Sequence, residues 1–148
     1  MSATDADTPD NWQGGCLCGA VRFRSTAAPT ATRYCWCRDC QHFAAGNATV
    51  NVIFPSDAVT IEGQTTAFES TADSGSRMKR SFCPRCGSPL FSQAESRPGW
   101  IIIRAGALDD PNLAEPSGSI WVASAPRWAC IDTDHPQLPG QPPPPPPR

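Results

Sequence analysis

Seven of the eight cysteines in this chain lie in three short clusters, a spacing that is typical of thiolate metal sites. The clusters hold Cys16 and Cys18, then Cys35, Cys37 and Cys40, then Cys83 and Cys86. A thiolate is a soft, charged ligand that suits zinc, and a closed structural zinc site takes four ligands. Seven cysteines therefore predict one closed four-cysteine site and one three-cysteine site whose fourth position stays open for chemistry.

The pair Cys83 and Cys86 gives the strongest of these signals, because a C-x-x-C turn places two sulfurs on one metal. Gly87 follows directly, and glycine tolerates the positive φ that such a turn uses. Together with Cys16 and Cys18, this pair predicts a structural zinc that joins the beginning of the chain to its middle. Zinc binding contributes about 10–16 kcal/mol to the folding of zinc-finger peptides, so this site is expected to stabilise the fold strongly.

The middle cluster offers three sulfurs within six residues and leaves the fourth zinc ligand undecided. Cys130, His42, a water molecule or a substrate could each fill that position. Zinc bound by three thiolates is a poor Lewis acid and is better suited to holding an incoming thiol as a nucleophilic thiolate. Cys35, Cys37 and Cys40 are therefore predicted to be catalytic, and the predicted chemistry acts on sulfur rather than on peptides or esters.

The composition argues against several classes of partner. The net charge of −2 disfavours a nucleic-acid-binding protein, which usually presents a basic face. The longest apolar run, residues 100–103, is far shorter than the roughly 20 residues that span a bilayer. The N-terminal residues lack the apolar stretch of a secretory signal, so we expect a cytoplasmic protein whose cysteines bind metal rather than form a disulfide scaffold.

Alternation of apolar and polar side chains predicts a mainly β domain of packed short antiparallel sheets, with little helix. The candidate strands cover residues 20–24, 49–54, 59–62, 66–70, 77–82, 89–92, 100–104 and 120–123. Residues 59–62 and 66–70, on either side of Gly63, are predicted to form a hairpin. Only residues 39–45 could form a turn or two of helix.

The ends of the chain differ from this pattern and set the predicted domain limits. Residues 1–11 are expected to be a flexible acidic leader, and residues 12–139 a single zinc-stabilised domain. Residues 140–148 contain six consecutive prolines, which lack backbone donors and favour an extended polyproline II conformation. We expect a disordered proline-rich tail there.

Three segments carry a resemblance to a known family. They are residues 14–23 (GGCLCGAVRF), 35–40 (CWCRDC) and 80–91 (RSFCPRCGSPLF). In these segments the chain resembles the glutathione-dependent formaldehyde-activating enzymes, a family that also includes centromere protein V. The likeness continues at residues 106–111 and 120–124 and covers about residues 12–139.

The resemblance implies a β-tent fold and two zinc ions. The structural zinc would be bound by Cys16, Cys18, Cys83 and Cys86, and the catalytic zinc by Cys35, Cys37 and Cys40. It also implies a carbon–sulfur lyase that runs toward synthesis and forms S-hydroxymethylglutathione from formaldehyde and glutathione. Ser119 stands where members often carry histidine, and no lysine follows Ser124 where members often have one. These departures would change the specificity if the two positions contact substrate.

Trp36, Arg38 and Arg80 are the predicted substrate-binding residues. Trp36 lies between two predicted ligands and could form one wall of the pocket. Glutathione is an anion, and a guanidinium can bind a carboxylate through two parallel hydrogen bonds. Asp39 and His42 are the candidates for proton transfer to the product oxygen.

These observations predict a zinc-dependent carbon–sulfur lyase-type enzyme that acts on an adduct of glutathione or of another thiol. The alternatives are a non-enzymatic zinc module that binds a protein or a thiol, and a redox sensor that uses labile thiolates. The predicted partner is a small thiol such as glutathione, with no nucleic acid and no membrane. The oligomeric state is left open.

Overall fold

Short stretches of alternating side chains form ten strands in two sheets, as a computed structural model of the protein shows for residues 12–143. The predicted mainly β fold with little helix is therefore confirmed. The predicted leader, residues 1–11, and the last part of the predicted tail, residues 144–148, lie outside the described residues. Within residues 12–143, no helix has the length and apolar character needed to cross a membrane.

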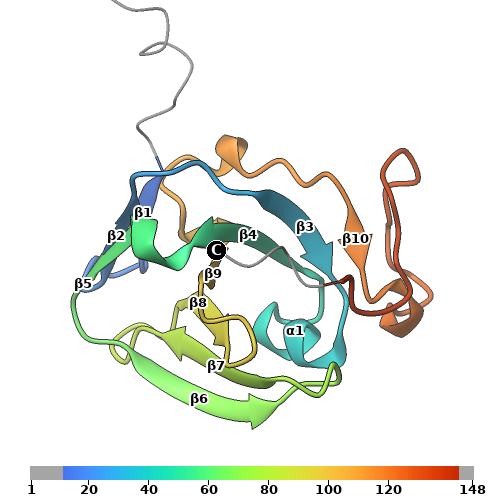
Figure 1. Ribbon diagram of the computed structural model, residues 1–148, viewed down its shortest axis with the longest axis horizontal. Helices are drawn as coiled ribbons and strands as arrows, with labels where there is room; N and C mark the ends of the chain where they lie inside the picture. The colour runs from blue at the N-terminus through green and yellow to red at the C-terminus, as the bar shows by residue number, and fades with distance from the viewer. Residues whose placement is uncertain (1–11, 144–148) are drawn as a thin grey trace, which may run out of the picture.

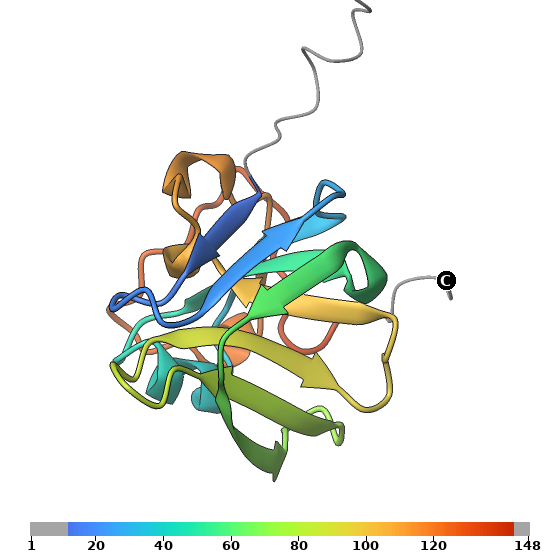
Figure 2. The ribbon, with the colours of Figure 1, turned by 90° about the vertical axis from the view of Figure 1, so that its left-hand side faces the viewer.

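The smaller sheet has the strand order β1-β2-β5 and is antiparallel throughout. It consists of β1 (Gln13–Gly15), β2 (Arg22–Ser25) and β5 (Val59–Glu62). Figure 2 shows these three strands side by side on the face turned to the viewer. Phe23 points inward from β2 and is 3% exposed, whereas its neighbours Arg22 and Arg24 are exposed, as the alternation of a strand requires.

The larger sheet has the strand order β10-β3-β4-β9-β8-β7-β6. Its strands are β3 (Ala31–Cys35), β4 (Thr49–Pro55), β6 (Thr66–Thr71), β7 (Arg77–Phe82), β8 (Pro89–Ala94), β9 (Trp100–Arg104) and β10 (Ser119–Ile120). Neighbouring strands are antiparallel except β10, which pairs with β3 in parallel. Figure 1 shows the sheet curving from β3 and β4, above the centre of the view, to β7 and β6 at the bottom.

The main core combines side chains from both sheets. Phe54 and Ile103 of the larger sheet are fully buried, and Phe23 of the smaller sheet belongs to the same cluster. The ring of Trp12 packs edge-on against Phe54, with the two ring centroids 5.6 Å apart. This contact fixes the start of the described chain, so Cys16 also lies within the core cluster.

The structure differs from the predicted strands at two places. Residues 59–62 and 66–70 do not form a hairpin, because β5 joins β2 in the smaller sheet and β6 pairs with β7 in the larger one. Gly63 follows β5, has a φ of 99° and lies against the backbone of Ala20. After this glycine the chain leaves the smaller sheet and enters the larger one at β6. The strand predicted for residues 120–123 ends at Ile120, because Trp121 adopts a left-handed backbone with φ of 57°.

Short helices and a return segment complete the described chain. The helices are α1 (Arg38–Phe43) and the 3-10 turns η2 (Ser56–Ala58), η3 (Ala105–Ala107), η4 (Pro111–Leu113) and η5 (Val122–Ser124). The return segment, residues 136–143, runs back along β10, where the N–H of Leu138 donates to the carbonyl oxygen of Ser119 at 2.9 Å (Figure 1). Nε1 of Trp121 donates to Oε1 of Gln141 at 2.9 Å, so the first residues of the predicted tail are held against the domain.

Candidate metal centres and the adjoining cavity

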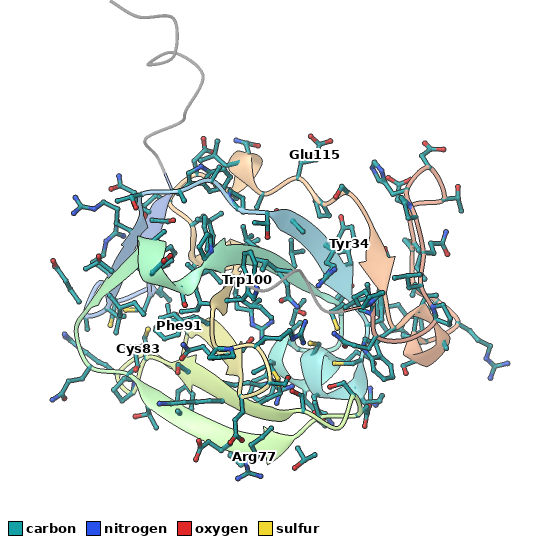
Figure 3. The ribbon with its side chains drawn as sticks, in the orientation of Figure 1. Tyr34, Arg77, Cys83, Phe91, Trp100 and Glu115 are labelled. Atoms are coloured by element: carbon teal, nitrogen blue, oxygen red, sulfur yellow. The ribbon has the colours of Figure 1, made fainter. Side chains whose placement is uncertain are left out.

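The four cysteines of the predicted structural site meet in space, because Cys16 directly follows β1 and Cys83 directly follows β7. All four Sγ atoms lie within 4.8 Å of one another, and Cys18 is 3.6 Å from Cys16 and 3.7 Å from Cys83. A tetrahedron with zinc–sulfur bonds of about 2.3 Å has edges of about 3.8 Å, whereas a disulfide bond is about 2.0 Å long. The group therefore fits a tetrahedral metal ion. Figure 3 shows Cys83 near Phe91, which belongs to the same core cluster.

Hydrogen bonds around Cys16 and Cys86 favour the thiolate form that a metal ion requires, whereas hydrogen bonds with the other thiols help to raise the pKa of Cys18 to about 11. The N–H of Val21 donates to Sγ of Cys16 at 3.2 Å. The Ser88 hydroxyl, 3.2 Å from Sγ of Cys86, helps to lower the pKa of Cys86 to about 5. Gly87 adopts φ of 77°, the positive value that the turn was expected to use.

The three cysteines of the predicted catalytic site also converge. Cys35 ends β3, Cys37 is the N-cap of α1, and Cys40 lies within that helix; their buried Sγ atoms are within 4.8 Å of one another. Sγ of Cys37 accepts a hydrogen bond from the N–H of Cys40 at 3.3 Å, so the cap that starts the helix also orients a ligand.

The ionisation of these three thiols is uneven. Hydrogen bonds from Cys35 and Cys37 lower the pKa of Cys40 to about 2, whereas hydrogen bonding to its two neighbours and burial raise the pKa of Cys35. One thiol therefore loses its proton readily while another resists losing it. A bound cation is the group that would hold all three buried sulfurs as thiolates, so the donor set fits a metal ion.

Neither protein side chain considered as a fourth ligand joins this group. Cys130 and His42 are both exposed, and neither belongs to the two clusters of candidate ligands in residues 12–143. The three cysteines instead line a cavity of about 60 Å³. A small molecule in that cavity could approach the sulfurs, as at an open zinc site.

The cavity is built on two cross-strand rows of the larger sheet. One row is Arg33, Asn51 and Arg104 on β3, β4 and β9, and the other is Ile53, Ile102, Ser92 and Arg80 on β4, β9, β8 and β7. Residues that are directly opposite in neighbouring strands project from the same face of a sheet. Strand order and register therefore bring these side chains together beside the cysteines.

Four arginines line the cavity, although the chain has a net charge of −2. They are Arg33, Arg80, Arg97 and Arg104. Arg104 is buried, and its guanidinium donates to Oδ1 of Asn51. Burial lowers the pKa of Arg104, but the ordinary pKa of a guanidinium is high enough that it stays charged. The cavity therefore presents positive charge to a ligand.

Arg80 and Ser92 contribute two buried polar atoms without a hydrogen-bond partner among the described residues. Arg80 is 5% exposed; its terminal nitrogens lie 3.1 Å from Oγ of Ser70 and 3.5 Å from a carboxylate oxygen of Asp39, but its Nε is unpaired. Oγ of Ser92, a residue 1% exposed, is also unpaired. Buried polar groups without partners cost free energy, so a ligand that reached these two atoms would relieve that cost.

The structure brings one of the three predicted substrate-binding residues to this cavity. Arg80 lines it, whereas Trp36 is buried elsewhere and Arg38 is exposed on α1. The candidates for proton transfer, Asp39 and His42, do not line the cavity either. His42 is exposed, and Asp39 forms an ion pair with Arg80.

Sequence reasoning did not single out Ser92, Arg97 or Arg104 as site residues. Arg104 ends the strand Trp-Ile-Ile-Ile-Arg, and a charged residue closing an apolar strand is a signal that could have found it. Arg97 lies in the turn between β8 and β9, where an arginine carries no such signal.

Two cysteine clusters in a mainly β domain define a β protein with two groups of thiols that could bind metal ions. Residues 11–124, which include both clusters, match the family model described as glutathione-dependent formaldehyde-activating enzyme. The chain belongs to this family.

Two known proteins are similar to the chain. A Halomonas elongata protein named "Putative glutathione-dependent formaldehyde-activating enzyme" is 29% identical over 128 residues, which cover 82% of this chain and 81% of that protein. A Rhodobacter sphaeroides protein of known crystal structure shares the fold, with a TM-score of 0.54 and 22% identity. That match covers 70% of this chain and 96% of the other.

Proposed function

We propose that this protein is a zinc-dependent carbon–sulfur lyase-type enzyme that forms S-hydroxymethylglutathione from formaldehyde and glutathione. Membership of the family supports this pair of substrates. The single observation that carries the proposal is the convergence of three buried cysteines and four arginines on one small cavity. A cavity of about 60 Å³ has room for a sulfur anion and a one-carbon electrophile.

Two zinc ions belong to the proposal. Cys16, Cys18, Cys83 and Cys86 would hold a structural ion, and Cys35, Cys37 and Cys40 would hold the ion beside the cavity. When bound there, zinc supplies positive charge that favours the thiolate form of an incoming thiol.

The reaction is an addition in which no atom is oxidised or reduced. The glutathione sulfur forms a bond to the carbon of formaldehyde, and the π electron pair of the carbonyl moves to its oxygen. That oxygen takes a proton, which balances the proton lost by the thiol. In the reverse direction the carbon–sulfur bond breaks and the same proton returns to sulfur.

The protein groups around the cavity stabilise the charges in this reaction. Arg104 places a guanidinium near the cysteines and favours an anionic sulfur there. Nε of Arg80 and Oγ of Ser92 can donate hydrogen bonds to the aldehyde oxygen as it becomes negative. Both groups are buried, so a hydrogen bond from either would form without competition from bulk water.

A cysteine substitution tests the proposal. Cys35→Ser should lose one zinc ion per chain, keep the folded state, and lose the catalysed exchange between free glutathione and its hydroxymethyl adduct. Metal analysis, thermal unfolding and NMR exchange spectroscopy measure the three properties. Cys130→Ser is the control, because Cys130 is exposed and lies outside both clusters. An exchange rate with wild-type protein equal to that in buffer would overturn the proposed enzyme activity.

One observation favours a thiol-binding module without turnover as the second candidate. Within residues 12–143, Asp73 is the one carboxylate that lines the cavity; it is exposed, and no histidine of this part of the chain lines the cavity. Apart from the cysteines, the described lining therefore offers no buried side chain suited to transferring a proton at neutral pH. A module of this kind would bind glutathione while leaving the exchange rate unchanged, so the same measurement separates the two candidates.

A further inference from the structure

A second and larger cavity adjoins the one beside the cysteines. It has a volume of about 300 Å³ and shares Arg33, Ile53, Arg97 and Ile102 with the smaller cavity. Its other lining residues include Trp100, which Figure 3 labels, and Pro143 of the return segment. The two arginines therefore stand where the small cavity beside the sulfurs meets a larger, mostly apolar space.

The two guanidiniums are half-buried and have no partner of opposite charge among residues 12–143. Within residues 12–143, neither the Arg33 nor the Arg97 side chain makes a hydrogen bond or an ion pair. Asp73 also lines the smaller cavity, but it is exposed and forms no ion pair with them. Like charges held together in a partly dry site are costly unless an anion binds between them.

The arginines and the cysteines line the same small cavity, and Arg33 and Cys35 lie on the same strand. Arg33 and Cys35 are two residues apart on β3, so they share a face of the strand and their Cα atoms are separated by about 7 Å. A cysteinylglycine unit carries its sulfur and its carboxylate at opposite ends, so one molecule could contact both side chains. The smaller cavity alone, at about 60 Å³, is too small for a whole peptide thiol, whereas the adjoining 300 Å³ space can take the remainder.

We propose that Arg33 and Arg97 bind the C-terminal carboxylate of a peptide thiol whose sulfur faces Cys35, Cys37 and Cys40. The guanidinium fork matches a carboxylate with two parallel hydrogen bonds. The glycyl carboxylate of glutathione suits this site because it stands alone, whereas the glutamyl carboxylate has an ammonium group beside it that two arginines repel. The proposal rests on the proposed function in taking glutathione as the thiol.

The proposed carboxylate site can be tested by measuring the binding of a glutathione analogue that cannot react with formaldehyde. Calorimetry with the zinc-loaded protein should show that S-methylglutathione binds and that its glycyl ethyl ester, which lacks the lone carboxylate, binds about 10-fold to 100-fold more weakly. Arg33→Gln and Arg97→Gln should each weaken S-methylglutathione binding by a similar factor and leave ester binding nearly unchanged. Arg24→Gln is the matched control, because Arg24 is an exposed strand arginine that lines neither cavity.

The outcomes separate this site from the catalytic proposal. Equal affinity for the acid and the ester, or no binding of either, would overturn the carboxylate site. Unchanged binding in both arginine variants would also overturn it. If the acid binds in the predicted manner while formaldehyde exchange runs at the buffer rate, the site stands and the enzyme activity fails.

Discussion

Gly14, the middle residue of β1, lies two residues before Cys16 and has no room for a side chain. A Cβ at this position would overlap the carbonyl oxygen of Ala107 and come within 2.8 Å of Cα of Leu108. We expect Gly14→Ala to lower the free energy of unfolding by about 3 kcal/mol, because backbone atoms must move to accommodate it. Urea unfolding measures the loss. Gly106→Ala is the control, since nothing lies within 4 Å of that position, and an equal loss there would contradict the steric explanation.

Substitution of Ser92 distinguishes a catalytic role of its hydroxyl from a purely structural one. Its buried Oγ has no partner in the described chain, so Ser92→Ala removes an unsatisfied group and should leave the unfolding temperature equal or slightly raised. If Oγ donates to the aldehyde oxygen, the catalysed exchange rate should fall by about 10-fold to 100-fold. Thermal unfolding and NMR exchange give the two readouts. A destabilised variant with an unchanged rate would assign Ser92 to the fold alone.

At the scale of elements, the return segment closes both cavities. Gln141 lines the smaller cavity and Pro143 lines the larger, and Gln141 is tied to the ring of Trp121. Truncation after Pro139 should therefore speed the transfer of zinc from the three-cysteine site to a colorimetric chelator, with little change in unfolding temperature. Deletion of residues 144–148 alone keeps Gln141 and Pro143 and should leave the rate unchanged. Equal rates for both deletions and the full chain would exclude a closing role for residues 140–143.

The ion pair between Arg22 and Asp109 joins β2 to the chain that follows η3. Nη1 and Nη2 of Arg22 lie 2.8 and 2.5 Å from the carboxylate oxygens, and this lowers the pKa of Asp109 below its usual 3.8. The stabilisation is therefore fully present above the unfolded pKa and is lost as the pH falls through the lower, folded pKa. Both side chains are nearly half exposed, so we expect about 0.5 kcal/mol.

Asp109→Asn measures that contribution. The difference in unfolding free energy between variant and wild type should be present at neutral pH and shrink toward the lowest pH at which both proteins stay folded. It should also shrink in high salt, because exposed charges are screened. A difference that is independent of pH and salt would mean that the hydrogen bonds, rather than the charges, stabilise this contact.

The elements also show what the sequence could predict. Both cysteine groups were predictable, because the four-cysteine group consists of two closely spaced pairs, and Cys35, Cys37 and Cys40 need only one strand end and one turn of helix. The arginine-lined cavity was not predictable, because its two rows cross β3, β4, β9, β8 and β7 in an order that the chain does not reveal. The predicted hairpin at residues 59–70 was wrong for the same reason. Local alternation predicts strands but does not predict which sheet each strand joins.

At the scale of the whole molecule, the four-cysteine group joins the two sheets. Cys16 extends β1 of the smaller sheet, and Cys83 extends β7 of the larger one. Both also belong to the main core cluster. The three-cysteine group lies in a separate, smaller cluster with Ile120, away from that junction. A metal ion in the first group would therefore stabilise the arrangement of the sheets, whereas an ion in the second would act mainly on the cavity.

Stepwise removal of zinc distinguishes these two effects. A chelator should take the first ion, from the three-cysteine site, with little change in unfolding temperature. Loss of the second ion, from the four-cysteine site, should lower the unfolding temperature by about 10 °C or more. Several kcal/mol of stability are lost with this ion, and each kcal/mol corresponds to about 2–4 °C in a domain of this size. Calorimetry with parallel zinc measurement follows both steps. Cys86→Ser should reproduce the large fall without chelator and Cys40→Ser should not; equal falls in the two variants would contradict this division of the seven cysteines.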